Sequence, residues 1–128
     1  MKLRAPALVP ALLLGLAASV ASAPLEIDGD LMRGIDDTAK SLDSSVAQKD
    51  AKSAAALAKD LVDTFGQVES HYAATPDTAD AVGFASRTQA YAEDVLKALD
   101  SGNFDAAADA VDKLTHSCKS CHDVYKKE

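Results

Sequence analysis

Three residues near the carboxyl end of the sequence have types and spacing that could do chemistry together. Cys118, Cys121 and His122 form the pattern C-x-x-C-H, which is the attachment motif of c-type haem. Residues three apart share one face of a helix, so both thiols could add to vinyl groups on one porphyrin edge. The imidazole that follows could bind the iron. The sequence therefore predicts one covalent haem c, with Cys118 and Cys121 as thioether residues and His122 as the proximal iron ligand.

Other uses of a C-x-x-C-H pattern have to be weighed against haem. Zinc needs about four ligands, and the sequence has only two cysteines. A thiol-redox pair usually opens a helix after a strand, whereas this pair is expected to close the last helix of an all-α chain. In an exported protein the two cysteines could also form a disulfide. A disulfide or another metal site therefore stays as the alternative to haem.

Met32 is the candidate for the sixth iron ligand, on the haem face opposite His122. It is expected near the start of the first helix, and His122 lies near the end of the last. In an antiparallel bundle these positions share one level, and ligation by methionine and histidine suits electron transfer. Two alternatives stay open: Met32 packs in the core, as most methionines do, or His71 is the ligand. His116 cannot reach the opposite haem face from its own helix and is expected on the surface.

These residues must be positioned by helices, because the sequence has almost no strand signal. Alanine is abundant and apolar residues recur every three or four positions. Helices are expected over residues 27–48, from about 50 to 73, from 76 to a stop at Gly102, and from 104 to 125. Three residues are expected to serve as N-caps of the second, third and fourth helices: Asp50, Thr75 and Asn103.

Four amphipathic helices joined by short links predict an all-α fold, an antiparallel up-down-up-down four-helix bundle. The many alanines allow the helices to approach closely but supply little apolar volume. A bundle of this composition needs a large group in its core, and a covalently bound haem is such a group. An ordinary small bundle without a cofactor is the alternative that composition alone leaves open.

The first residues have the order of a secretory signal peptide: a basic start, an apolar run and small residues before a cleavage site. The apolar run is shorter than the roughly 20 residues that a membrane span needs. Cleavage is expected after Ala21, because a cut after Ala23 would place Pro24 next to the protease. We therefore expect a signal peptide at 1–21, a monohaem cytochrome bundle at 22–128, and a periplasmic location. An uncleaved membrane anchor is the alternative.

The chain is acidic, with a formal net charge of −7. Nucleic acid and anionic membranes are poor partners for such a surface, whereas a basic protein could be steered toward it. Four lysines nevertheless cluster around the motif in the sequence: Lys113, Lys119, Lys126 and Lys127. They predict a redox partner protein that docks at the haem edge with a salt-dependent rate. Alternatively, they only complement the carboxyl end of the last helix.

The sequence resembles the class II c-type cytochromes, the cytochrome c-prime family. In that family an aromatic and a basic residue typically follow the histidine by three and four positions, as Tyr125 and Lys126 do here. The segment 31–35 is similar to the family's distal segment, which faces the haem. The resemblance implies a low-spin member if Met32 binds the iron, a member with an open distal site if it does not, and a possible homodimer.

One position departs from the family pattern. Where the family often has an arginine near the haem propionates, one turn before the distal position, this sequence has Asp28. The propionates must then pair with other groups, for which Arg33 and Arg87 are the candidates, or face water.

A one-electron carrier is the leading functional hypothesis. The sequence shows no nucleophile–base pair, so no enzyme activity is expected. The alternative is a protein that binds nitric oxide or carbon monoxide at an open or displaceable sixth position. Its distal pocket would be apolar, with candidate lining residues Leu31, Phe65, Phe84 and Tyr91. A subunit of a larger respiratory complex is a third possibility.

Overall fold

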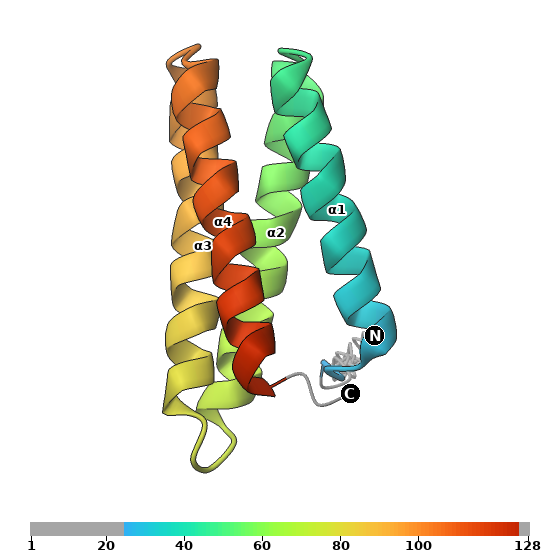
Figure 1. Cartoon of the computed structure of the whole chain (residues 1–128), viewed down its shortest axis with the longest axis vertical. Coiled ribbons are helices and arrows are strands. Elements are labelled where there is room, and N and C mark those ends of the chain that lie inside the picture. Colours follow the sequence, from blue (N-terminus) through green and yellow to red (C-terminus); the bar gives the residue numbers. More distant parts are fainter. Residues whose placement is uncertain (1–24, 126–128) are drawn as a thin grey trace, which may run out of the picture.

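The computed structural model describes residues 25–125, and these residues form an antiparallel four-helix bundle (Figure 1). The helices are α1 (Gly29–Ala47), α2 (Ala51–Ala73), α3 (Ala79–Asp100) and α4 (Phe104–Tyr125). The predicted all-α bundle is therefore confirmed. No helix in the described part of the chain is both long enough and apolar enough to cross a membrane. The predicted signal peptide at 1–21 lies outside the described residues.

The helices follow one another around a square, so that α1 packs on α2 and α4, and α3 packs on α2 and α4. The start of α1, the α2–α3 connection and the end of α4 all lie at the lower end in Figure 1. We call this the motif end, formed by residues 25–35, 68–82 and 114–125. Toward the motif end α1 diverges from α2 (Figure 1).

The core is most completely buried toward the middle of the bundle. All four helices contribute large side chains that are almost fully buried: Leu42, Leu61, Val95, Val111 and Leu114. Alanines with no exposed surface lie between them and let the helices approach: Ala54, Ala58, Ala92 and Ala107. The apolar stripes expected from the 3.6-residue period therefore do face inward.

The core is incomplete at the motif end. Several apolar side chains there pack against the edge of the core but keep part of their surface exposed: Leu25, Ile27, Leu31, Met32, Tyr72 and Cys118. Exposed apolar surface costs free energy in water, roughly 25 cal/mol per Å². A large apolar group bound at this end would cover such surface.

Two of the three expected N-caps are confirmed and one is wrong. The Asp50 carboxylate accepts a hydrogen bond from the Ser53 N–H at 3.1 Å, and the Asn103 side chain accepts one from Ala106 at 3.0 Å. The third helix begins at Ala79 after Thr78, and not at residue 76 after a Thr75 cap.

The late start of α3 has a physical reason in the α2–α3 connection. Asp77 has a φ of +61°, a left-handed conformation through which a right-handed helix cannot pass. The Thr78 hydroxyl then donates to the carbonyls of Tyr72 at 2.7 Å and Thr75 at 2.9 Å. These bonds hold the chain as a turn, so Pro76 lies in the turn and not in the helix.

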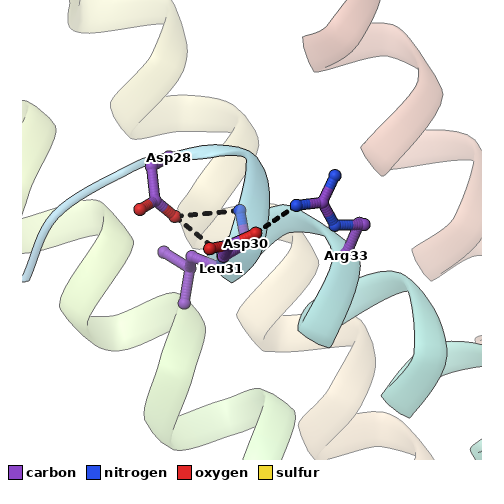
Figure 2. Close-up of polar contacts among 4 residues, drawn as sticks. All are labelled: Asp28, Asp30, Leu31 and Arg33. Carbon is purple, nitrogen blue, oxygen red and sulfur yellow. Dashed lines mark hydrogen bonds and ion pairs between the residues drawn. The ribbon is translucent and has the colours of Figure 1, made fainter.

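Asp28 is the N-cap of α1. Its carboxylate accepts hydrogen bonds from the N–H groups of Asp30 at 3.0 Å and Leu31 at 2.8 Å (Figure 2). The departure from the family pattern at this position therefore has a structural role, because it fixes the helical turn that carries Met32. Arg33 pairs with Asp30 and its side chain is 76% exposed, so it lies on the outer surface of α1 (Figure 2).

Replacing Asp28 by alanine is expected to lower the free energy of unfolding by about 1 kcal/mol, the usual cost of losing an N-cap. The reason is that two N–H groups in the first turn of α1 lose their acceptor. Chemical denaturation of the mature protein measures the effect. Asp43→Ala is the matched control, because Asp43 is an exposed acid on the same helix. An equal loss in both variants would contradict the capping role.

Candidate functional site

The haem-attachment motif lies in the last two turns of α4. Cys118 and Cys121 are half-buried at the edge of the core, and His122 is exposed. With about 100° per residue, Cys121 lies about 60° to one side of Cys118 and His122 about 40° to the other. The two thiols therefore point along the core-facing side of one helix, and the imidazole lies on its flank.

The flank of α4 that carries His122 is turned away from α3. Ser117, about 100° from Cys118 on the side of Cys121, hydrogen-bonds Thr88 of α3 at 2.7 Å. That side of α4 therefore faces α3, and His122 lies on the other side of Cys118, where its side chain is exposed.

Met32 lies near the start of α1, at the motif end. Its side chain is half-buried against the core. Asp36 comes one helical turn later, and its negative charge contributes to the raised pKa of the Cys118 thiol on α4. The structure thus brings Met32 and His122 to the same end of the bundle.

Cys118 and Cys121 do not form a disulfide with each other, and burial favours the protonated form of both thiols. Burial first, and then the charges of Cys121 and Asp36, raise the pKa of Cys118 to about 11. Burial and the charge of Asp80 raise the pKa of Cys121. Redox-active cysteines have a lowered thiol pKa, because the thiolate is the nucleophile. The electrostatics of the pair therefore argue against the thiol-redox alternative.

His71 and His116, the other two histidines, also lie at the motif end. Among residues 25–125 no three His, Cys, Asp or Glu side chains come together as a metal-ion site would require, so the zinc alternative lacks partners in the described part. His116 is exposed, as predicted, and its Nδ1 lies 2.8 Å from the Asp112 carbonyl. His71 is half-buried with its ring edge-on to Tyr72, at a centroid distance of 5.3 Å.

An aromatic contact that the sequence did not predict anchors the last turn of α4. The Tyr125 hydroxyl donates a hydrogen bond to the Asp80 carboxylate on α3. The Tyr125 ring also packs on Tyr72 of α2, with centroids 5.8 Å apart. Tyr125 thereby contacts both α3 and α2, which fixes the turn that contains Cys121 and His122.

The Tyr125–Asp80 hydrogen bond is expected to stabilise the protein only at intermediate pH. The bond lowers the pKa of Asp80, so its contribution is present above the unfolded value of 3.8 and is lost as pH falls through the lowered folded value. It also raises the pKa of Tyr125 above 10.0, so the contribution is lost again in alkali. Chemical denaturation should show Tyr125→Phe to be less stable than the wild type near pH 7 and equally stable in acid.

Tyr91→Phe is the matched control for this prediction, because Tyr91 is a half-buried tyrosine on α3 that takes no part in the contact with Asp80. Its effect on stability is expected to be the same at every pH between 3 and 8. If the difference between wild type and Tyr125→Phe is also constant over that range, the hydrogen bond does not contribute.

Several residues singled out in the sequence lie away from the motif's inner face. Phe84, Tyr91, Arg87 and Lys113 line a groove between α3 and α4, in which the Arg87 guanidinium lies 5.0 Å from the centre of the Phe84 ring. Lys119 pairs with Asp123 at 2.9 Å. Lys113 and Lys119 lie about 120° apart around the helix, and therefore on different flanks of α4. Lys126 and Lys127 are outside the described residues.

The residues present at the motif end fit a covalently attached haem. Two protonated thiols lie one helical turn apart beside an exposed imidazole, and a half-buried thioether lies on the facing helix. Partly exposed apolar side chains at the edge of the core lie at the same end. Thioether carbon–sulfur bonds consume both thiols, and imidazole and thioether are established haem-iron ligands.

Comparison with known proteins agrees with this fit. The family profile described as "Cytochrome C'" matches residues 28–126, from the cap of α1 to the residue after α4. A "Cytochrome c'" of Alcaligenes xylosoxydans xylosoxydans is 36% identical over 53 residues, which are 39% of this chain and 42% of that relative. The match therefore spans less than half the length of the curated relative. No solved structure gives a significant match.

Proposed function

The chain belongs to the cytochrome c′ family, whose members bind haem c with iron, and we propose that it is a monohaem carrier of single electrons. Cys118 and Cys121 hold the haem through thioether bonds, His122 binds the iron from α4, and Met32 binds it from α1. The chain has two cysteines, enough for one such attachment. When bound, the haem supplies an iron that changes oxidation state by one electron.

The position of Met32 is the observation that carries this proposal. It lies at the motif end, as His122 does, and its half-buried side chain packs against the edge of the core. With a protein ligand on each side of the iron, a change of charge requires little movement of either helix. This arrangement thus supports a carrier better than a catalyst, and we propose no enzymatic activity.

A visible spectrum of the mature protein, made in a host that attaches c-type haem, tests the proposal. The oxidised protein is expected to be low-spin, with a weak sulfur–iron band near roughly 695 nm. A potentiometric titration should fit one electron per polypeptide. A colourless protein with two free thiols would overturn the proposal, because no haem would be attached.

The gas-binding alternative is tested by the same preparation. A high-spin spectrum that survives purification, together with rapid carbon monoxide binding by the reduced protein, would assign an open distal site. The four residues expected to line that site do not lie together. Phe84 and Tyr91 line the groove between α3 and α4, whereas Phe65 is in the core and Leu31 packs against it.

We also propose that the protein is exported to the periplasm, where it meets a redox partner protein. Sequencing of the mature amino terminus should give Ser22, or Pro24 if cleavage follows Ala23. A transfer rate that falls with added salt would support docking through charged side chains. Sedimentation analysis would test the homodimer.

A further inference from the structure

Two polar side chains lie within the otherwise apolar core of residues 25–125, and they bond to each other. Thr88 on α3 is 2% exposed and Ser117 on α4 is 7% exposed. Their hydroxyl oxygens are 2.7 Å apart. Both oxygens also lie near the carbonyl of Phe84, at 2.8 Å for Thr88 and 3.4 Å for Ser117. Every buried side-chain oxygen and nitrogen in this part of the chain has a partner.

A directional bond matters here because it holds in one relative position of the two helices only. Both hydroxyls are buried, and Ser117 has its short hydrogen-bond contact with Thr88 of α3. A shift of α4 by one turn, about 5.4 Å, would break this contact. Thr88 would keep the Phe84 carbonyl of its own helix, but Ser117 would lose its partners on α3, which is costly for a buried polar group.

We propose that Thr88 and Ser117 form a register lock, which fixes the rotation and axial position of α4 and so positions the haem-binding residues. Ser117 directly precedes Cys118 and lies five residues before His122. Any rotation of α4 at Ser117 is therefore carried to both residues by the rigid helix. The inference rests on the proposed function for its consequence at the iron, but the lock itself is a property of the polypeptide.

Ser117→Ala and Thr88→Val remove one hydroxyl each and keep the helices apolar at the contact. Thr88→Ser keeps the hydroxyl and is expected to behave as the wild type. Thr115→Ala is the matched control, because the Thr115 hydroxyl bonds only the Val111 carbonyl of its own helix, on the exposed face. The double variant is expected to match the single ones, since either change breaks the same bond.

Two measurements separate the lock from the proposed function. In the haem-free polypeptide, amide hydrogen exchange over residues 117–122 should speed up about tenfold in Ser117→Ala and Thr88→Val, and not in Thr115→Ala. In the reduced holoprotein, carbon monoxide should bind about tenfold faster in the same two variants, because displaced helices hold the sixth ligand less firmly.

The register lock is overturned if Ser117→Ala and Thr88→Val match Thr115→Ala in amide exchange. It is equally overturned if Thr88→Ser shows the full effect, because the effect would then not depend on the hydroxyl. Faster exchange in a protein that carries no covalent haem would support the lock and overturn the proposed function. Faster exchange with unchanged carbon monoxide binding would overturn its role in positioning the iron ligands.

Discussion

Replacing Cys118 and Cys121 together by serine is expected to abolish covalent haem. A serine hydroxyl does not take the place of a thiol in the thioether bond, and the chain has no other cysteine. Acidified acetone, which extracts haem that is not covalently bound, should then remove all of it. The wild type should keep all of its haem in the protein. The fraction of haem in each phase is read from its absorbance.

Two further variants make this prediction specific to the motif. Cys118→Ser alone should leave one thioether, through Cys121, and so retain haem after extraction with a shifted absorption maximum. Ser120→Ala lies between the cysteines, and its exposed hydroxyl bonds only the His116 carbonyl of its own helix. It should retain haem as the wild type does. Retention of haem by the double serine variant would rule out the thioether assignment.

Met32→Leu is expected to convert the oxidised protein from low-spin to high-spin without unfolding it. Leucine keeps the volume and apolar character of methionine, a change that cores usually tolerate at less than about 1.5 kcal/mol. It removes the sulfur that we propose as the sixth iron ligand. The band near roughly 695 nm should disappear, and carbon monoxide should bind the reduced protein about tenfold faster or more, because the sixth position is already open.

Met32→Ala separates ligation from packing. It should give the same high-spin spectrum as Met32→Leu but also lose about 1–2 kcal/mol of stability, less than a fully buried methionine would. Met32 is half-buried at the motif end, which limits that loss. If Met32→Leu keeps the wild-type spectrum, Met32 is a packing residue only and the sixth ligand must be sought elsewhere.

Periodicity predicted most of the fold. Apolar residues at every third or fourth position predicted four amphipathic helices, and the structure buries apolar side chains from each of them, Leu42, Leu61, Val95 and Leu114. The fourth helix begins at Phe104 after its Asn103 cap, as expected from the glycine and asparagine that precede it. Such local features are encoded by neighbouring residues, and a single sequence therefore shows them.

Contacts between distant residues could not be predicted in the same way. Tyr125 and Asp80 are 45 positions apart, and Ser117 and Thr88 are 29 apart, so their pairing depends on how the helices are rotated in the bundle. The predicted start of α3 was wrong because Asp77 takes a left-handed conformation. That conformation is open to several residue types in a turn, and no local pattern required it here. The C-x-x-C-H motif could be recognised without knowing how the helices pack, because its residues lie within five consecutive positions.

The uneven closure of the core has a consequence for how the molecule assembles. The half remote from the motif holds side chains such as Leu42 and Val95 with no exposed surface, while Met32 and Tyr72 remain half-covered. Hydrophobic burial is the main driving force of folding. Newly made chains should therefore fold first at the remote half. The prosthetic group would then bind a partly folded chain and cover the apolar side chains at the motif end.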